Sequence, residues 1–238
     1  MDVAHEVSRP WLLPYLPLAQ HVLHAAKSQA LVEVLNAARN GTFHTIRFAD
    51  HFELPPTEPY ESFIARTGRV PTRDNLHDLF NGVMWLAWPQ TKRRLNALQA
   101  QEIAKRGTAG PRGALRDALT VFDENAAVLQ APTLLVDALR ARHWKALFTE
   151  QRALWQSARL VVFGHALLEK LMQPRKAITA HVWIVDELTD EALSASLTVE
   201  RLTSKPFLPL PVLGVPGWWA ANEAAGFYDD AEVFRPLR

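Results

Sequence analysis

The chain has 238 residues, a formal net charge of +1 and no cysteine, and 48% of its residues are hydrophobic and 21% charged. These values are typical of a globular protein, and the missing cysteine excludes disulfides, thiolate zinc sites, iron–sulfur clusters and a cysteine nucleophile. A charge so close to zero creates no global field that would recruit nucleic acid or a membrane surface.

No segment resembles an export signal or a membrane span. The start, Met1–Glu6, is acidic and lacks the basic and apolar stretches of a secretory signal. Nowhere do about 18 apolar residues follow one another without a charge or a proline. We therefore expect a soluble, cytoplasmic protein.

The first third of the chain predicts helices separated by turns. Residues 17–40 have helical character, with Ser28 as the N-cap of the second half. A short extended segment is expected at 43–48. Residues 58–67 then predict a short helix that ends at Gly68, because glycine readily ends a helix.

Helices dominate from Thr72 onward. Thr72 and Thr91 are expected to cap helices that run to Ala87 and Arg106. The β-branched residues of Ile178–Val185 predict a strand. Further helices are predicted at 113–122, 132–142, 144–156, 158–173 and 189–203.

Residues 205–238 form a proline-rich tail. Pro206–Trp219 is strongly apolar, yet its prolines prevent a helix or a central strand. Exposed, it would be an association hazard, so we expect it to wrap back over a helical body at 17–204. The alternative is a docking strip for a partner. The predicted fold is mainly α: one multi-helix domain over 1–238, with one or two short β segments and a long irregular tail packed on the helices.

The segment Thr72–Asn81 is unusually rich in hydrogen-bonding side chains for a helix that also carries much apolar surface. Its His77 and Asn81 are four residues apart, so both can reach one bound atom, and Asp78 lies beside them. One interpretation is a ligand or metal site. The other is a satisfied polar network that locks the helix to its neighbours.

Two further clusters carry similar chemistry. Asp123 and Glu124 lie near a predicted helix end, where negative charge is unfavourable, so they need cationic or metal partners, unless this is simply a solvated helix end. His165 and Glu169 are four residues apart, a spacing that metal-binding helices use. However, His165 lies within an apolar stripe, which is also typical of a core histidine. A fourth segment places Asp229 and Asp230 near Arg235, where they would form either an ion-pair latch or part of a site brought back to the helix that carries His77.

The chain lacks the glycine-rich dinucleotide and P-loop motifs, the G-x-S-x-G elbow and H-E-x-x-H. The leading hypothesis is a metal-assisted hydrolase-like enzyme, in which magnesium, manganese or zinc activates water. Its catalytic residues would be His77, Asp78, Asn81 and Glu124, and its metal ligands Asp123, His165 and Glu169.

The competing hypothesis is a non-catalytic binding or interaction protein. It would use an exposed basic helical face with Lys92, Arg93 and Arg94, or the aromatic tail. A small-molecule ligand fits either hypothesis. Nucleic acid is not the expected partner, because a basic stretch in a near-neutral protein is usually a solvated helix face. The residues alone do not decide whether the chain is an enzyme.

Several segments also carry a family resemblance. They are Pro71–Asn81, Arg116–Asn125, Phe163–Lys170, Pro209–Trp218 and Phe227–Asp230. Together they resemble an uncharacterised bacterial family catalogued as domain of unknown function 3025. The resemblance covers most of the chain, which favours treating it as one unit, and it implies no activity, substrate or catalytic residue.

Overall fold

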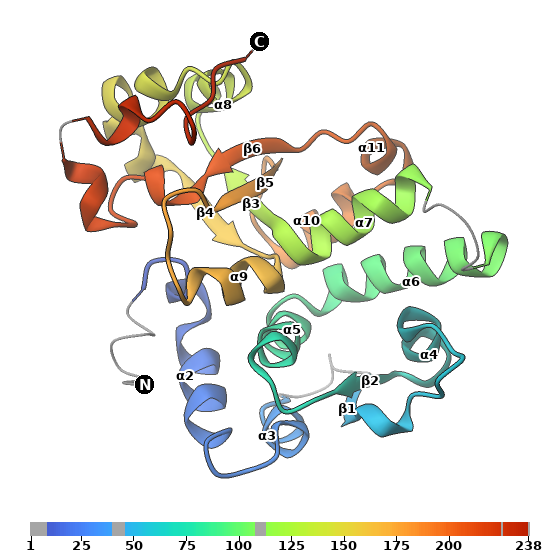
Figure 1. Ribbon diagram of the computed structural model, residues 1–238. Helices are drawn as coiled ribbons and strands as arrows, with labels where there is room; N and C mark the ends of the chain where they lie inside the picture. Colours follow the sequence, from blue (N-terminus) through green and yellow to red (C-terminus); the bar gives the residue numbers. More distant parts are fainter. Residues whose placement is uncertain (1–8, 40–45, 108–112, 225, 238) are drawn as a thin grey trace.

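The computed structural model describes residues 9–39, 46–107, 113–224 and 226–237, and Figure 1 shows their arrangement. The chain is mostly helical, as predicted. The expectation of one or two short β segments was too low, because the described residues contain six strands in two sheets. Among the helices of this described part, none is both long and apolar enough to cross a membrane.

The N-terminal third combines helices with a small two-stranded sheet. Its elements are η1 (Leu13–Tyr15), α2 (Leu16–Ala25), α3 (Leu31–Ala37), β1 (Arg47–Asp50), η3 (His51–Glu53), α4 (Tyr60–Thr67) and β2 (Arg69–Thr72). β1 and β2 pair in parallel, with Phe48 opposite Val70. Gly68 ends α4 with a φ of 67°, as predicted. Of the predicted extended segment, residues 43–45 lie outside the described residues.

A mixed four-stranded sheet, in the order β4–β3–β5–β6, lies in the other part of the molecule (Figure 1). Its strands are β3 (Ala126–Gln130), β4 (Arg159–Val162), β5 (Thr179–Ile184) and β6 (Leu208–Pro211). β3 and β5 are parallel, and the outer strands pair antiparallel to them. The predicted strand at Ile178–Val185 is confirmed as β5. The prolines of β6 are compatible with a strand because β6 lies at the sheet edge.

Helices and short turns connect these strands. They are α5 (Leu76–Ala87), α6 (Pro89–Arg106), α7 (Ala114–Asn125), α8 (Thr133–Arg140), η4 (Ala146–Glu150), η5 (Arg152–Ser157), α9 (His165–Leu171), α10 (Asp190–Ser196) and α11 (Val199–Thr203). The predicted helix at 158–173 was wrong in its first part, which is β4. The stiff β-branched Val161 and Val162 favour the strand, and helix begins only after Gly164.

Three predicted helix caps were wrong. Thr72 belongs to β2, and α5 begins after Asn75, whose side chain accepts a hydrogen bond from the Asp78 amide. Thr91 lies inside α6, which begins at Pro89, and it bonds Asp190 instead. Ser28 lies in the turn before α3, whose N-cap is Ala30. All three residues have side chains that can cap a helix, so residue type alone does not show where a helix begins.

Helix α5 is covered on several sides. Every residue from Asp78 to Leu86 is buried. Its principal neighbours are α2, α3, α6 and α9. A helix buried all round must pair its polar groups with other elements, and this is how the candidate site arises.

The tail continues from β6 through short turns. These are η6 (Val212–Gly214), η7 (Ala220–Glu223) and η8 (Phe227–Asp229). Val212 and Leu213 are fully buried, and Phe227 and Phe234 are nearly so. The Asn222 side chain donates to two backbone oxygens of the preceding segment.

Candidate functional site

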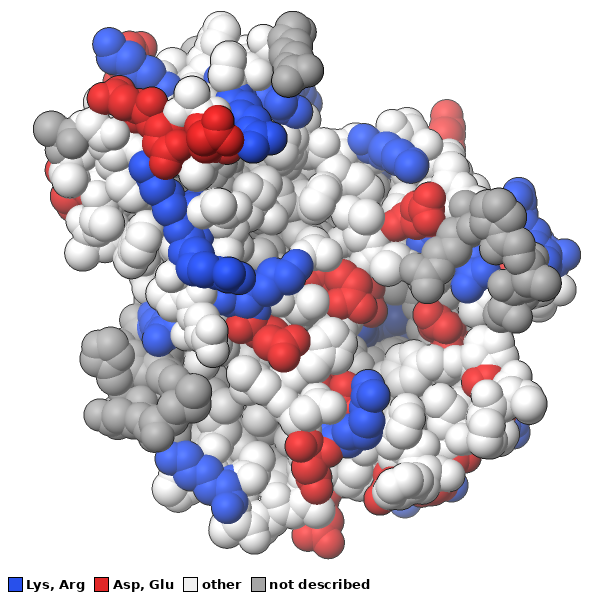
Figure 2. All heavy atoms as spheres, viewed as in Figure 1, with Lys and Arg blue, Asp and Glu red and all other residues white. Residues whose placement is uncertain are grey.

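Polar side chains from α5, α6, α7 and α9 converge on one cavity of about 310 Å³. The face shown in Figure 2 is hollowed near its centre, with acidic side chains beside the opening and a basic side chain recessed in it. All the predicted site residues except Glu169 line this cavity. Glu169 lies behind His77 and bonds to it.

Four lining residues have a buried nitrogen or oxygen atom without a hydrogen-bond partner in the described part of the chain. They are His51, Trp85, Gln99 and His165. Buried polar atoms are normally paired, so such atoms around a cavity are typical of a place where a ligand or an ion supplies the partner. A closed structural network would leave few of them.

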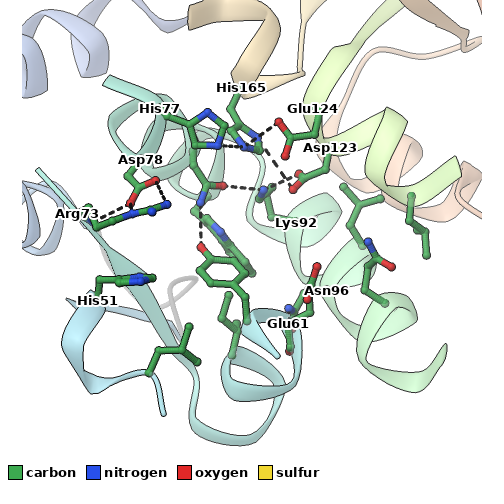
Figure 3. Close-up of a pocket in the computed structure, with 18 residues that line it drawn as sticks. His51, Glu61, Arg73, His77, Asp78, Lys92, Asn96, Asp123, Glu124 and His165 are labelled. Atoms are coloured by element: carbon green, nitrogen blue, oxygen red, sulfur yellow. Dashed lines mark hydrogen bonds and ion pairs between the residues drawn. The ribbon is translucent and has the colours of Figure 1, made fainter. Parts of the chain in front are cut away.

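Three side chains meet at one end of the cavity, as Figure 3 shows. The Nε2 atoms of His77 and His165 are 3.2 Å apart. The Oε2 atom of Glu124 lies 3.4 Å from His165 Nε2. One ligand atom from each of the three falls within 4.8 Å of the others, so this group could hold a metal ion.

Gly164 brings His165 to Glu124. A Cβ atom at position 164 would lie 2.5 Å from the Glu124 carbonyl oxygen and 2.5 Å from the Asn125 nitrogen. The Gly164 amide also donates to the Ala126 oxygen at 2.8 Å. Only glycine allows so close an approach of the two backbones, so the start of α9 lies directly against the end of α7.

The orientation of His77 is fixed from behind. Its Nδ1 atom donates to Glu169 Oε2 at 2.9 Å, since a carboxylate can only accept. This hydrogen bond directs the Nε2 atom of His77 towards His165, where it can serve as a metal ligand. A carboxylate behind a histidine in this way is the usual support of a metal-binding imidazole.

His165 is 4% exposed, and its Nδ1 atom has no hydrogen-bond partner in the described chain. Burial lowers its pKa to about 4, although the charge of Asp123 acts in the opposite direction. The ring is therefore neutral at pH 7. Glu124 differs, because burial and the neighbouring Asp123 raise its pKa.

Lys92 organises the middle of the cavity. Its ammonium group donates to Asp123 Oδ1 at 2.5 Å and to Asn81 Oδ1 at 2.8 Å. The Asn81 amide donates in turn to the Tyr60 hydroxyl at 3.0 Å. Burial is the largest single influence on the pKa of Asp123 and raises it, but the charge and hydrogen bond of Lys92, together with His165 and His77, outweigh burial and lower that pKa. Asp123 thus remains ionised.

Asp78 has a separate partner. Its carboxylate accepts hydrogen bonds from the backbone amide and from the guanidinium of Arg73, at 2.7 and 3.1 Å. The side chain of Asp78 is 7% exposed and that of Arg73 57% exposed. The pair lies at the side of the cavity, where Arg73 reaches solvent.

The structure groups the candidate metal ligands differently from the prediction. Of the predicted ligands Asp123, His165 and Glu169, only His165 belongs to the group that could hold a metal in the described chain. Its other members, His77 and Glu124, had been predicted as catalytic residues. Asp123 is held by Lys92 and Glu169 by His77. The roles themselves remain predictions.

Sequence reasoning missed Lys92 as a site residue. The expectation that it lies on an exposed basic face was wrong, because Lys92 is 3% exposed. Its partners, Asn81 and Asp123, are on other helices, so no local spacing reveals them. The need of Asp123 for a cationic partner at a helix end was the signal that pointed to such a residue.

Comparison with known proteins gives a family and no further match. A family model described as a protein of unknown function (DUF3025) matches residues 46–238. No curated protein and no solved structure matches significantly. The matched range contains every residue that lines the cavity.

Proposed function

Because this chain belongs to the DUF3025 family, whose description gives no function, we propose its function from the site itself: a metal-dependent, hydrolase-like enzyme. The metal would be held by His77, His165 and Glu124. Two histidines and one glutamate are a ligand set of catalytic zinc sites, which leave one position open for water or substrate. The adjoining cavity provides space for that position.

The spacing of the ligand atoms is the observation that supports this proposal most directly. A tetrahedral zinc ion with Zn–N bonds of about 2.0–2.1 Å separates its ligand atoms by about 3.3–3.4 Å. The separations of 3.2 Å between the two Nε2 atoms and 3.4 Å from His165 Nε2 to Glu124 agree with this value. Imidazole nitrogens suit zinc better than magnesium, so we expect the site to bind zinc. Manganese should bind the same site more weakly.

The surrounding residues supply the remaining chemistry. A divalent ion lowers the pKa of bound water and so generates a nucleophile near neutral pH. Asp123 keeps its Oδ2 atom free of Lys92, 4.0 Å from His165 Nδ1, and we assign it as the carboxylate that accepts a proton. Lys92 would stabilise negative charge that develops on a substrate oxygen. Asn81 positions Lys92, and Asp78 positions Arg73.

The first test is metal binding. Protein purified without added metal should contain about one zinc per chain, and stripped protein should regain thermal stability on zinc addition. Ligand at about 100 times its Kd stabilises a protein by about 2.7 kcal/mol. His77→Gln and Glu124→Gln should remove this shift, whereas His21→Gln and Glu33→Gln, at exposed positions, should retain it.

The second test is activity. A panel of chromogenic esters, amides and phosphoesters should reveal hydrolysis that is lost on chelation and restored by zinc. Absence of metal, together with no thermal shift from zinc, manganese or magnesium, would contradict the proposal. The two histidines and Glu124 would then be a hydrogen-bonded structural network, with the His165 ring donating from Nε2.

A further inference from the structure

The end of the cavity away from the metal group has its own chemistry. Helix α6 presents Lys92, Asn96 and Gln99 to the cavity, at a spacing of four and three residues that keeps them on one helical face. From Lys92 to Gln99 this face extends about 10 Å along the helix. Figure 3 shows Asn96 and Glu61 together at the opposite end from His77, His165 and Glu124.

The charges in the cavity are paired with one exception. Arg73 pairs with Asp78, and Lys92 with Asp123. Glu124 belongs to the metal group. Among the described residues, Glu61 is the charged lining residue left without an ion pair, although it is only partly exposed. Its carboxylate is therefore available to a cation that enters the cavity.

The neighbours of Glu61 offer acceptors as well. The Asn96 amide nitrogen donates to the Glu61 backbone oxygen at 3.1 Å, and the Asn96 side-chain oxygen accepts no hydrogen bond from the residues that the structure describes. The Gln99 nitrogen bonds Thr120, while its Oε1 atom is buried and unpartnered within the described chain. Gln99 is only 8% exposed. A carboxylate and two amide oxygens require a group rich in hydrogen-bond donors, and an ammonium group has three donors and no acceptor.

We infer that the substrate is an extended molecule with a primary amine at one end. Its scissile carbonyl would lie at the metal group, and its ammonium group would bind Glu61, Asn96 and Gln99. The apolar Ile64 and Leu95, which line the cavity, suit an alkyl chain between the two ends. This inference rests on the proposed function, because the metal group fixes the other end of the substrate.

A matched pair of inhibitors tests the amine end without knowledge of the substrate. Aminohexanoyl hydroxamate and heptanoyl hydroxamate each chelate a metal, and they differ only in a terminal ammonium or methyl group. Calorimetric titration of the zinc-loaded protein should show at least about tenfold tighter binding of the aminated compound, because its charge-assisted hydrogen bonds form in a partly desolvated site. Glu61→Gln should remove this preference and leave heptanoyl hydroxamate binding unchanged, which also reports an intact fold.

The outcomes separate the two proposals. Equal binding of both compounds, or a preference that survives Glu61→Gln, overturns the amine inference and leaves the metal site intact. Failure of both compounds to bind the zinc-loaded protein also overturns the amine inference, whereas a protein that cannot be loaded with zinc overturns the proposed function. Glu33→Gln is the control, because this glutamate lies on α3 and is exposed; a lost preference in this variant would also contradict the role of Glu61.

Discussion

Two lysine–aspartate pairs in this molecule have the same chemistry and different surroundings. In the cavity, Lys92 lies 2.5 Å from Asp123, with side chains 4% and 30% exposed. Just before β5, Lys176 lies 3.0 Å from Asp230 of the tail, with side chains 28% and 35% exposed. Both ammonium groups also lie over aromatic rings, Lys92 over Trp85 and Lys176 over Phe227.

The difference in burial gives the two pairs different roles. A buried ion pair costs much desolvation free energy and contributes little net stability, but loss of one partner leaves an unpaired buried charge. A more exposed ion pair contributes little to the free energy of unfolding, and loss of one partner leaves a charge that water can solvate. The cavity pair is therefore a fixed part of the candidate site, and the tail pair is a weak tether.

The largest expected effect follows from Lys92→Met. It leaves Asp123 charged beside the cavity without its partner, and removal of one member of a buried pair costs about 3–5 kcal/mol. Since the Asp123 side chain is 30% exposed, water will offset part of this loss, and we expect about 3 kcal/mol by urea unfolding. The double variant Lys92→Met with Asp123→Asn should recover much of it. Additive effects in that double variant would show that the pair is not coupled.

Gly164→Ala should come next. The new methyl group collides with the backbone of Glu124 and Asn125, so α9 must move away from α7. Overpacking of this kind costs about 1–3 kcal/mol. The same movement separates His165 from Glu124, so the variant should lose zinc affinity by more than its loss of stability explains. Wild-type zinc affinity in a destabilised variant would mean that the contact serves packing alone.

Glu169→Gln is expected to affect metal binding and leave the fold nearly unchanged. The amide can no longer fix the His77 tautomer as a charged acceptor does, and loss of such a supporting carboxylate costs about 10–100-fold in metal affinity. Zinc titration against a chelating dye measures this, with Glu33→Gln at an exposed position of α3 as the control. An unchanged affinity would remove Glu169 from the site.

Local patterns in the sequence predicted residues that line the candidate cavity better than they predicted the strands. His77 and Asn81, and likewise His165 and Glu169, were found because polar residues four apart share a helical face. The convergence of His77, Asn81 and His165 on one cavity, with Glu169 bonded to His77, matches the need of polar groups on apolar helices for partners. Which atoms meet depends on α7 and α9 lying in contact at Gly164, and no spacing within either segment reveals that contact.

The missed strands have a similar explanation. β3 is an almost completely buried apolar run, and a short run without alternation does not distinguish strand from helix. β6 contains two prolines, which lack a backbone N–H. A strand tolerates them here because β6 lies at the edge of the described sheet and pairs with β5 on one side. Both features depend on the sheet order, which is a tertiary property.

The smallest effect should follow from Lys176→Met, which removes the cationic partner of Asp230 in the tail. The variant loses the ion pair with Asp230 and the cation–π contacts with Phe227 and Phe234, but these rings remain packed on Phe148 or on each other. We expect faster thermolysin cleavage near residues 226–237 and unchanged zinc binding, with the exposed Lys145→Met as the control.

The hydrogen bond from Lys176 lowers the pKa of Asp230 below its usual 3.8. Protection of the tail by this pair should thus be complete above that value and be lost as the pH falls through the lower pKa of the folded state. Equal cleavage of both variants would show that the aromatic packing alone holds the tail, whereas a loss of zinc binding would contradict the separation of the two regions.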